Sequence, residues 1–272
     1  MREIDVLHLG NPRVICCYAI DDVIVDPGPE VTHRTLVEQL DAPPRAILLT
    51  HIHLDHAGAA GRLAELWPEA EVWVHERGAR HLVDPSKLLA SATRLYGDAM
   101  DRLWGAFLPV PEERVRVLRG GETIDGFDVL YTPGHASHHV TYLHHATRTA
   151  FCGDVGGVRV GEGPVLPPTP PPDIDLDAWR DSLDALEAWG PERLAPTHFG
   201  LHDDVAHQLA ELRRNLTHWG ERGRVLDEQA YILEISAWIE AESEEPATLR
   251  QAMPPETLWA GLHRYWSKRE AR

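Results

Sequence analysis

The feature that most constrains this chain is a short run in which four candidate metal ligands follow a buried strand. The apolar residues 45–50 (RAILLT) predict a strand, and the chain continues with His51, His53, Asp55 and His56. A strand has a side-chain period of two, so His51 and His53 fall on the same side. The turn into the following helix then moves Asp55 and His56 to a second position. Imidazole and carboxylate together suit zinc, iron or manganese, so the run predicts a metal site.

Three later segments repeat the order of strand end, turn residue and candidate ligand. They are Gly134-His135, Gly153-Asp154 and Thr197-His198, each after an apolar run. Ligands at the ends of different strands converge on one edge of a sheet, where α/β enzymes usually place their sites. We therefore expect these side chains to join the first four in a single centre.

In this order, the motifs between Asp26 and His198 resemble those of the metallo-β-lactamase superfamily. The resemblance implies an α/β fold, a four-layer αββα sandwich with a binuclear metal site at its edge. Carried over residue by residue, it assigns the first metal to His51, His53 and His135, the second to Asp55, His56 and His198, and the bridge to Asp154. Asp26, in the run VDPG, matches the strand-end Asp of the family, which supports the ligand loop without binding metal.

The chemistry of such a site is hydrolytic. Two divalent metals about 3.5–4 Å apart can share a water and lower its pKa towards neutrality. The resulting hydroxide would attack an acyl carbon, with Asp55 as the catalytic residue that orients it or accepts its proton. We expect two divalent metal ions as cofactors, with zinc favoured and iron or manganese as alternatives.

The order of apolar runs predicts two parts of the chain. Residues 1–200 alternate strands and helices, with a helical insertion at about 86–107 and a Pro-rich segment at 161–173 that favours an extended surface loop. Residues 201–272 predict a helical extension packed on this body. Its tryptophans, Trp219, Trp238, Trp259 and Trp266, favour core packing, with a dimer interface or a lid over the site as the alternative.

Composition narrows the partners and the compartment. With 26 Lys and Arg against 43 Asp and Glu, the net charge of −17 disfavours nucleic acid. Three irregularly spaced cysteines do not form a disulfide framework. No signal peptide and no apolar run of the roughly 18 residues that a membrane span needs are apparent. We expect a cytoplasmic protein with a small-molecule substrate and no membrane partner, with a homodimer as an open alternative.

Several branches of the family fit poorly. The flavin-linked iron branch has Glu where this chain has His53, and secreted β-lactamases usually lack the bridging residue seen here as Asp154. Hydrolases of esters, thioesters and lactones remain, including the glyoxalase-II-like and lactonase-like dinuclear branches. The Tyr that lactonases carry beyond the bridging Asp is replaced here by Val155-Gly156-Gly157-Val158. In addition, no motif match supports a glutathione-binding role for Arg264, Lys268 and Arg269.

The sequence therefore predicts a dinuclear metal-dependent hydrolase of a small acyl ester, thioester or lactone. The alternative is a mononuclear iron enzyme like the persulfide dioxygenases of the superfamily, and a third reading is a non-catalytic protein stabilised by metal. Among the remaining histidines, His138 and His139 are candidates for contact with a ligand or the substrate. Surface or packing roles are favoured for His8, His75 and His202, and solvent exposure for His144 and His145.

Overall fold

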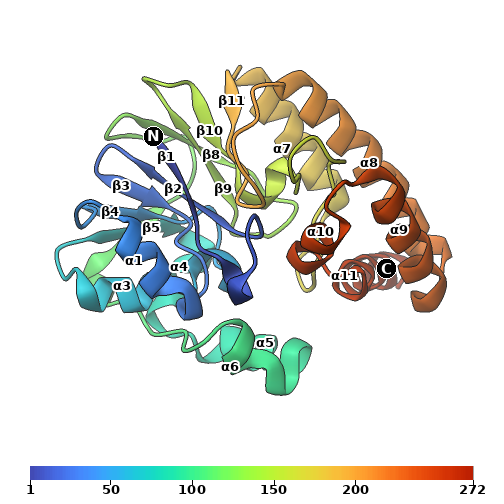
Figure 1. Ribbon diagram of the computed structural model, residues 1–272, viewed down its shortest axis with the longest axis horizontal. Helices are drawn as coiled ribbons and strands as arrows, with labels where there is room; N and C mark the ends of the chain where they lie inside the picture. The colour runs from blue at the N-terminus through green and yellow to red at the C-terminus, as the bar shows by residue number, and fades with distance from the viewer. Residues whose placement is uncertain (272) are drawn as a thin grey trace.

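The computed structural model describes residues 1–271, which form two mixed β-sheets stacked face to face (Figure 1). The first sheet follows chain order: β1 (Arg2–Asp5), β2 (Cys16–Ile20), β3 (Val23–Val25), β4 (Ala46–Leu48), β5 (Glu71–His75) and β6 (Val115–Leu118). The second has the spatial order β11 (Arg193–Leu194), β10 (Thr149–Phe151), β9 (Val140–His144), β8 (Phe127–Tyr131) and β7 (Thr123–Ile124). Strands β3 to β6 are parallel, as is the β10–β11 pair, and the other pairs are antiparallel.

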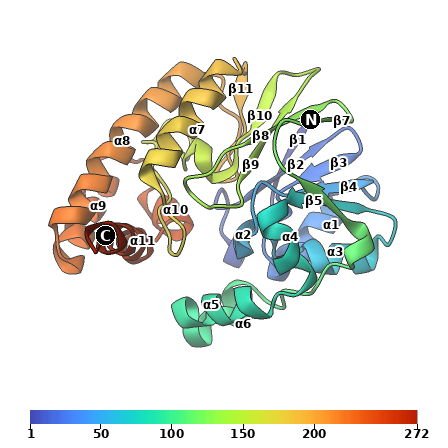
Figure 2. The ribbon, with the colours of Figure 1, turned by 180° about the vertical axis from the view of Figure 1, so that it is seen from behind.

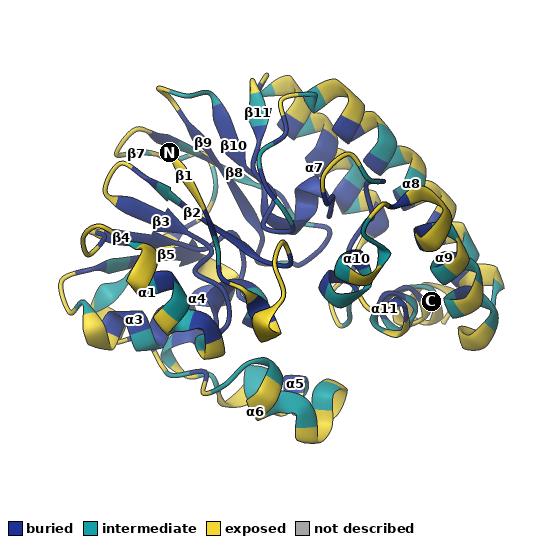
Figure 3. Cartoon of the chain, viewed as in Figure 1, coloured by how far each residue is buried: buried dark blue, intermediate teal, exposed yellow. Residues whose placement is uncertain are grey.

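The central strands are apolar throughout because both faces of each sheet are covered. In β4, for example, Ala46 and Leu48 join Trp73 and Tyr142 in the core between the sheets, while Ile47 points to the helices outside. Figure 3 shows the strands as mostly buried, whereas the helices keep exposed faces towards solvent. The alternation of side chains thus builds two separate apolar layers from continuous hydrophobic runs.

Helices cover the outer face of each sheet (Figures 1 and 2). On the side of the first sheet lie α1 (His33–Gln39), α3 (Ala60–Leu66) and α4 (Glu76–Val83), and on the side of the second lie α7 (Leu176–Ala188) and α8 (Val205–Val225). Four short 3-10 helices, η1 (His8–Gly10), η2 (Glu30–Thr32), η4 (Glu112–Arg114) and η5 (Gly153–Gly156), lie in the connections. The predicted four-layer αββα sandwich is confirmed.

The predicted insertion is helical over a slightly shorter range than expected. It contains α5 (Ser86–Tyr96), the 3-10 turn η3 (Gly97–Ala99) and α6 (Met100–Leu103), and it projects from the end of the sandwich (Figure 1). Phe107, at the end of the predicted range, lies in the following loop and is buried.

The chain ends in a helical region that continues from α8. It comprises α9 (Glu228–Glu242), α10 (Pro246–Ala252) and α11 (Pro255–Glu270). Trp219 is buried between these helices, while Trp266 Nε1 donates to the Gly220 carbonyl at 2.8 Å and Trp259 Nε1 to the Leu226 carbonyl at 3.3 Å. The tryptophans therefore hold these helices together. The division of the chain into two domains at residue 200 stays a prediction.

The prediction of a surface loop at 161–173 is wrong for the middle of that segment. Residues 164–169 are buried, because the chain passes between the sandwich and the C-terminal helices. Asn215 Nδ2 donates to the Val165 carbonyl at 2.8 Å, and Thr169 Oγ1 donates to the Leu258 carbonyl at 3.1 Å. A side chain of α8 thus satisfies a backbone carbonyl of the segment, and a side chain of the segment donates to the backbone of α11.

His144 also differs from the prediction of a solvated side chain, whereas His145 is exposed as expected. The His144 ring is buried against Phe127 and contacts Thr147 Oγ1 at 3.0 Å and Asp21 Oδ2 at 3.2 Å. The three cysteines are buried free thiols. Within residues 1–271, no helix combines the length and apolar character that crossing a membrane requires.

Candidate metal centre

The four ligand-bearing segments leave their strands at the same edge of the sandwich. His51, His53, Asp55 and His56 follow β4, and the last two lie in the short helix α2 (Leu54–Ala57). His135 follows β8, Asp154 lies in η5 after β10, and His198 follows β11. The fold brings together all seven side chains that the sequence analysis singled out, as two groups of three with Asp154 between them.

The first group consists of His51, His53 and His135. His51 Nε2 lies 3.0 Å from His53 Nδ1, and His135 Nε2 lies 3.2 Å and 2.9 Å from those two atoms. Three ring nitrogens this close can point their lone pairs at one shared point. This arrangement suits a cation held by three neutral imidazoles.

The second group consists of Asp55, His56 and His198. Asp55 Oδ2 lies 3.4 Å from His198 Nε2 and 3.9 Å from His56 Nε2. Both Nε2 atoms are buried without a hydrogen-bond partner. Because unsatisfied buried nitrogens are rare, the convergence of these two on a carboxylate fits the binding of a cation between them.

Asp154 lies between the two groups. Its Oδ2 is 3.3 Å from His135 Nε2 in the first group, while its Oδ1 is 3.2 Å from His56 Nε2 and 3.7 Å from His198 Nε2 in the second. Oδ1 is itself buried and has no hydrogen-bond partner. The two oxygens of one carboxylate thus face two separate sets of nitrogens, and the donor set fits divalent cations at both.

Asp26 organises both groups from behind. Its Oδ2 accepts from His56 Nδ1 at 2.8 Å and from the hydroxyls of Thr50 and Thr197, each at 2.7 Å. Because the Thr50 hydroxyl donates to Asp26, it is left to accept from His51 Nδ1 at 3.1 Å. One buried carboxylate therefore fixes the ring of a histidine in each group and leaves both Nε2 atoms free to bind metal.

Backbone carbonyls orient two further imidazoles. His135 Nδ1 lies 2.8 Å from the Pro168 carbonyl, and His198 Nδ1 lies 2.6 Å from the Val14 carbonyl. A carbonyl can only accept, so each Nδ1 carries the proton and each Nε2 presents a lone pair. The sequence analysis missed both partners, because a backbone carbonyl leaves no residue-type signal.

Burial and charge favour the same protonation states in the first group and at Asp154. Burial and the neighbouring imidazoles lower the pKa of His51 and lower that of His53 to about 3, so both are neutral. Burial alone would raise the pKa of Asp154, yet His56 and His135 hold it well below its usual range. Neutral imidazole and ionised carboxylate are the forms that bind divalent metals. In the second group, burial alone would lower the pKa of His56 and of His198, but Asp154 and Asp55 raise both.

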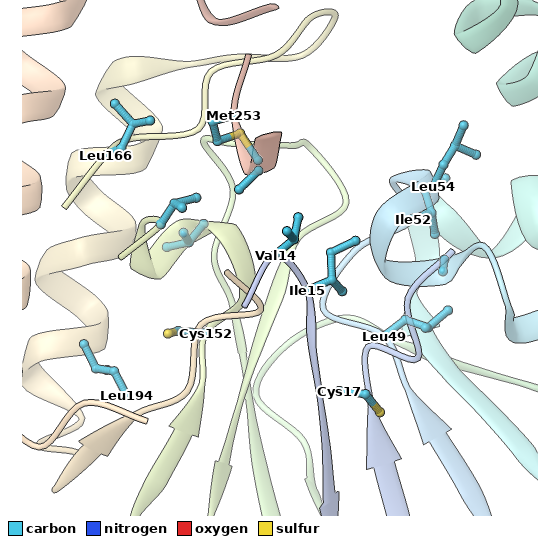
Figure 4. Packing of buried hydrophobic residues seen from close by; sticks show 14 of the residues in the cluster. Val14, Ile15, Cys17, Leu49, Ile52, Leu54, Cys152, Leu166, Leu194 and Met253 are labelled. Atoms are coloured by element: carbon cyan, nitrogen blue, oxygen red, sulfur yellow. The ribbon is translucent and has the colours of Figure 1, made fainter. Parts of the chain in front are cut away.

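A mainly apolar cavity of about 190 Å³ opens onto this centre. His53, Asp55 and Asp154 line it together with residues of the predicted insertion and Pro170 to Pro172. Residues 251–254 and Thr257 line it as well, and nothing in the sequence pointed to them. Figure 4 labels Met253 and Val14, and both belong to the same buried cluster.

The other histidines take several roles. His138 is stacked at 6.1 Å from the His51 ring, and His139 Nε2 is buried without a hydrogen-bond partner. His8 lines the apolar cavity and stacks on Trp104 at 5.4 Å. His75 caps α4 and His202 contacts the Phe199 carbonyl at 3.2 Å, which are structural roles, as expected.

Comparison with known proteins gives the family. The sequence model of the Metallo-beta-lactamase superfamily matches residues 12–198. The chain belongs to this superfamily. Its members are mostly metal-dependent hydrolases, and the fold implies divalent metal binding.

Two relatives illustrate the range of similarity. The metallo-beta-lactamase fold-containing protein ST1585 of Sulfurisphaera tokodaii is 29% identical over 224 residues, which cover 76% of this chain and 82% of that protein. The hydroxyacylglutathione hydrolase GloC of Haemophilus influenzae is 34% identical over 168 residues, covering 57% of this chain and 74% of GloC.

Solved structures agree with the fold. The archaeal superfamily protein ST1585 from Sulfolobus tokodaii superposes with a TM-score of 0.73 at 24% identity, covering 96% of this chain and 97% of that one. The structure of TTHA1623 in a di-iron-bound form has a TM-score of 0.57 at 29% identity, covering 72% of this chain and 93% of TTHA1623.

Proposed function

We propose that this chain is a dinuclear metal-dependent hydrolase of a small acyl ester, thioester or lactone. The observation that carries the proposal is the position of Asp154, whose two carboxylate oxygens face separate sets of histidine nitrogens. The similarity to a hydroxyacylglutathione hydrolase, itself a thioester hydrolase by name, supports the class of bond.

Each predicted ligand has a defined task. His51, His53 and His135 would hold one ion, Asp55, His56 and His198 the other, and Asp154 both. Bound divalent ions would supply an activated water and polarise the acyl carbonyl. Asp55 borders the cavity and its side chain is 17% exposed, so it can orient the water and accept its proton.

The apolar cavity would take the substrate. Leu88, Ala92, Tyr96 and Met253 give it walls suited to a hydrocarbon group, and Asp55 marks the reacting end. Burial of apolar surface there would hold the acyl or leaving group beside the metal centre and limit the entry of bulk water.

Metal analysis and activity assays on one sample test the proposal. We expect two metal ions per chain in protein purified without chelator, and turnover of at least one of a thioester, a lactone and a p-nitrophenyl ester. The variant His56→Ala should lose that turnover. A single iron per chain with no hydrolysis would overturn the proposal, and oxygen uptake with glutathione persulfide would then identify the dioxygenase alternative.

A further inference from the structure

A second cavity of about 620 Å³ lies beside the apolar one. His53, Leu88, Ser91 and Pro172 line both cavities. Because His53 belongs to the metal centre, the two cavities meet at the position where the scissile bond would lie.

The second cavity differs from the first in its charge. Arg77 and Arg80 of α4 and Lys87 of α5 line it, whereas no lysine or arginine lies among the described residues that line the apolar cavity. The Arg77 guanidinium lies over the Tyr131 ring at 5.8 Å, and Arg80 Nε donates to His81 Nε2 at 3.2 Å. Within residues 1–271, none of the three cations has a carboxylate at ion-pair distance.

Two carboxylates also border this cavity, and both have partners. Glu76 forms an ion pair with Arg119 at 2.8 Å, and Asp173 accepts a hydrogen bond from Ser137 Oγ at 2.8 Å. In a chain of net charge −17, three cations without carboxylate partners around one cavity stand out. They leave a local positive excess directly beside a predicted metal ligand.

We infer that the cavity lined by Arg77, Arg80 and Lys87 binds an anionic group of the substrate. The inference rests on the proposed function and narrows its substrate class. The substrate would be an ester or thioester with an anionic group, such as a carboxylate, on one side of the scissile bond and an apolar group on the other. With the bond at the metal centre, the two arms would enter the two cavities.

A matched pair of substrates tests this assignment. One is the butyryl thioester of mercaptoacetate, which carries a carboxylate, and the other is the butyryl thioester of methyl mercaptoacetate, which is neutral. We expect wild-type protein to prefer the anionic thioester by about 10-fold or more in kcat/KM, because charge-assisted hydrogen bonds to its carboxylate form only with that substrate.

Charge-removing variants locate the effect. The double variant Arg80→Gln with Lys87→Gln should bring the ratio of the two kcat/KM values near one, because kcat/KM falls for the anionic thioester. The control Arg94→Gln with Arg214→Gln removes the same charge from exposed helix positions and should keep the preference. Equal cleavage of both thioesters by wild type, or a preference retained by the cavity variant, would overturn the assignment.

A binding measurement separates this inference from the proposed hydrolysis. If wild type with bound metal cleaves neither thioester, the proposed hydrolysis has failed. Saturation-transfer NMR then measures the binding of ethanesulfonate, which tests the anion site independently of hydrolysis. Binding that is lost in the double cavity variant supports the site, and equal binding by both proteins overturns it.

Discussion

The Asp26 carboxylate accepts a hydrogen bond from His56 Nδ1 at 2.8 Å, while Nε2 of the same ring faces Asp154 Oδ1 at 3.2 Å. Both side chains of the first contact are completely buried. Asp26 has a positive φ of 49°, which turns its carboxylate under the ligand loop. The ring of a predicted ligand is therefore fixed by a residue that lies outside both groups of ligands.

The variant Asp26→Asn should bind metal roughly 10–100-fold more weakly, because partners behind a ligand contribute that much to affinity. In either orientation the NH2 group of the amide would face a donor, namely the Thr50 N–H at one position or the donors of Thr50, Thr197 and His56 at the other. Metal titration of chelator-treated protein gives the affinity, and circular dichroism checks the fold. Thr197→Val, which removes only one of the four contacts to the Asp26 carboxylate, is the control and should have a smaller effect. Unchanged affinity in Asp26→Asn would contradict this role.

The variant Ser91→Trp should lower kcat/KM strongly without changing metal content or thermal stability. Ser91 lies on α5, is half-buried, and lines both cavities at their junction, so an indole there would occupy the space for substrate. Steady-state kinetics and elemental analysis check the prediction. The neighbouring Ala90 is exposed, and Ala90→Trp should behave like wild type. Equal activity of the two variants would show that the substrate lies elsewhere.

The variant Gly261→Ala should be less stable by about 1–3 kcal/mol, the usual cost of overpacking. A Cβ at residue 261 would lie 1.9 Å from the Thr169 carbonyl oxygen and 2.7 Å from the Pro170 carbonyl carbon. This clash outweighs the roughly 1 kcal/mol by which alanine favours a helix over glycine, because backbone atoms cannot turn aside. Thermal unfolding measures the change. Ser267→Ala, at an exposed site in α11, should be neutral, and a stabilised Gly261→Ala would refute the close contact.

The Asp204–Arg159 pair should make stability depend on pH. Both Asp204 oxygens accept from the buried Arg159 Nη1 at 2.8 Å. Burial alone would raise the pKa of Asp204, but this contact lowers it. When the pKa of a carboxyl is lower in the folded than in the unfolded protein, its ionised form stabilises the fold. That stabilisation is present at pH values above the unfolded-state pKa of about 3.9, and it is lost as the pH falls through the folded-state pKa. Wild type should therefore exceed Asp204→Asn in urea midpoint by more at pH 6 than at pH 3. Asp203→Asn, at an exposed neighbouring position, should show no such difference.

The strands could be predicted because their signals are local, whereas the four-layer sandwich followed from the resemblance to the family. Apolar runs ending in Gly, Pro or Thr mark the strands, and His51, His135 and His198 each follow one. Convergence at one edge then follows from sheet geometry. These same signals could not show that residues 164–169 are buried, because a Pro-rich segment has the same sequence pattern in a surface loop and beneath a helix.

Long-range contacts account for the rest of what sequence reasoning missed. His144 is buried because Phe127 packs on it and Asp21 contacts it, and neither is near it in the sequence. Similarly, residues 251–254 reach the cavity only because α8 to α11 fold back over the sheet ends. Side-chain type predicts what a residue can do, but only the tertiary fold determines which distant segment faces it.

The scattering of the ligands along the chain has a consequence for how the protein assembles. The two groups need residues 51–56 from the first sheet and His135, Asp154 and His198 from segments that follow strands of the second. Neither group is complete until both sheets have formed and met. Metal uptake should therefore follow the pairing of the two sheets, and bound ions would join the halves of the sandwich and slow their separation.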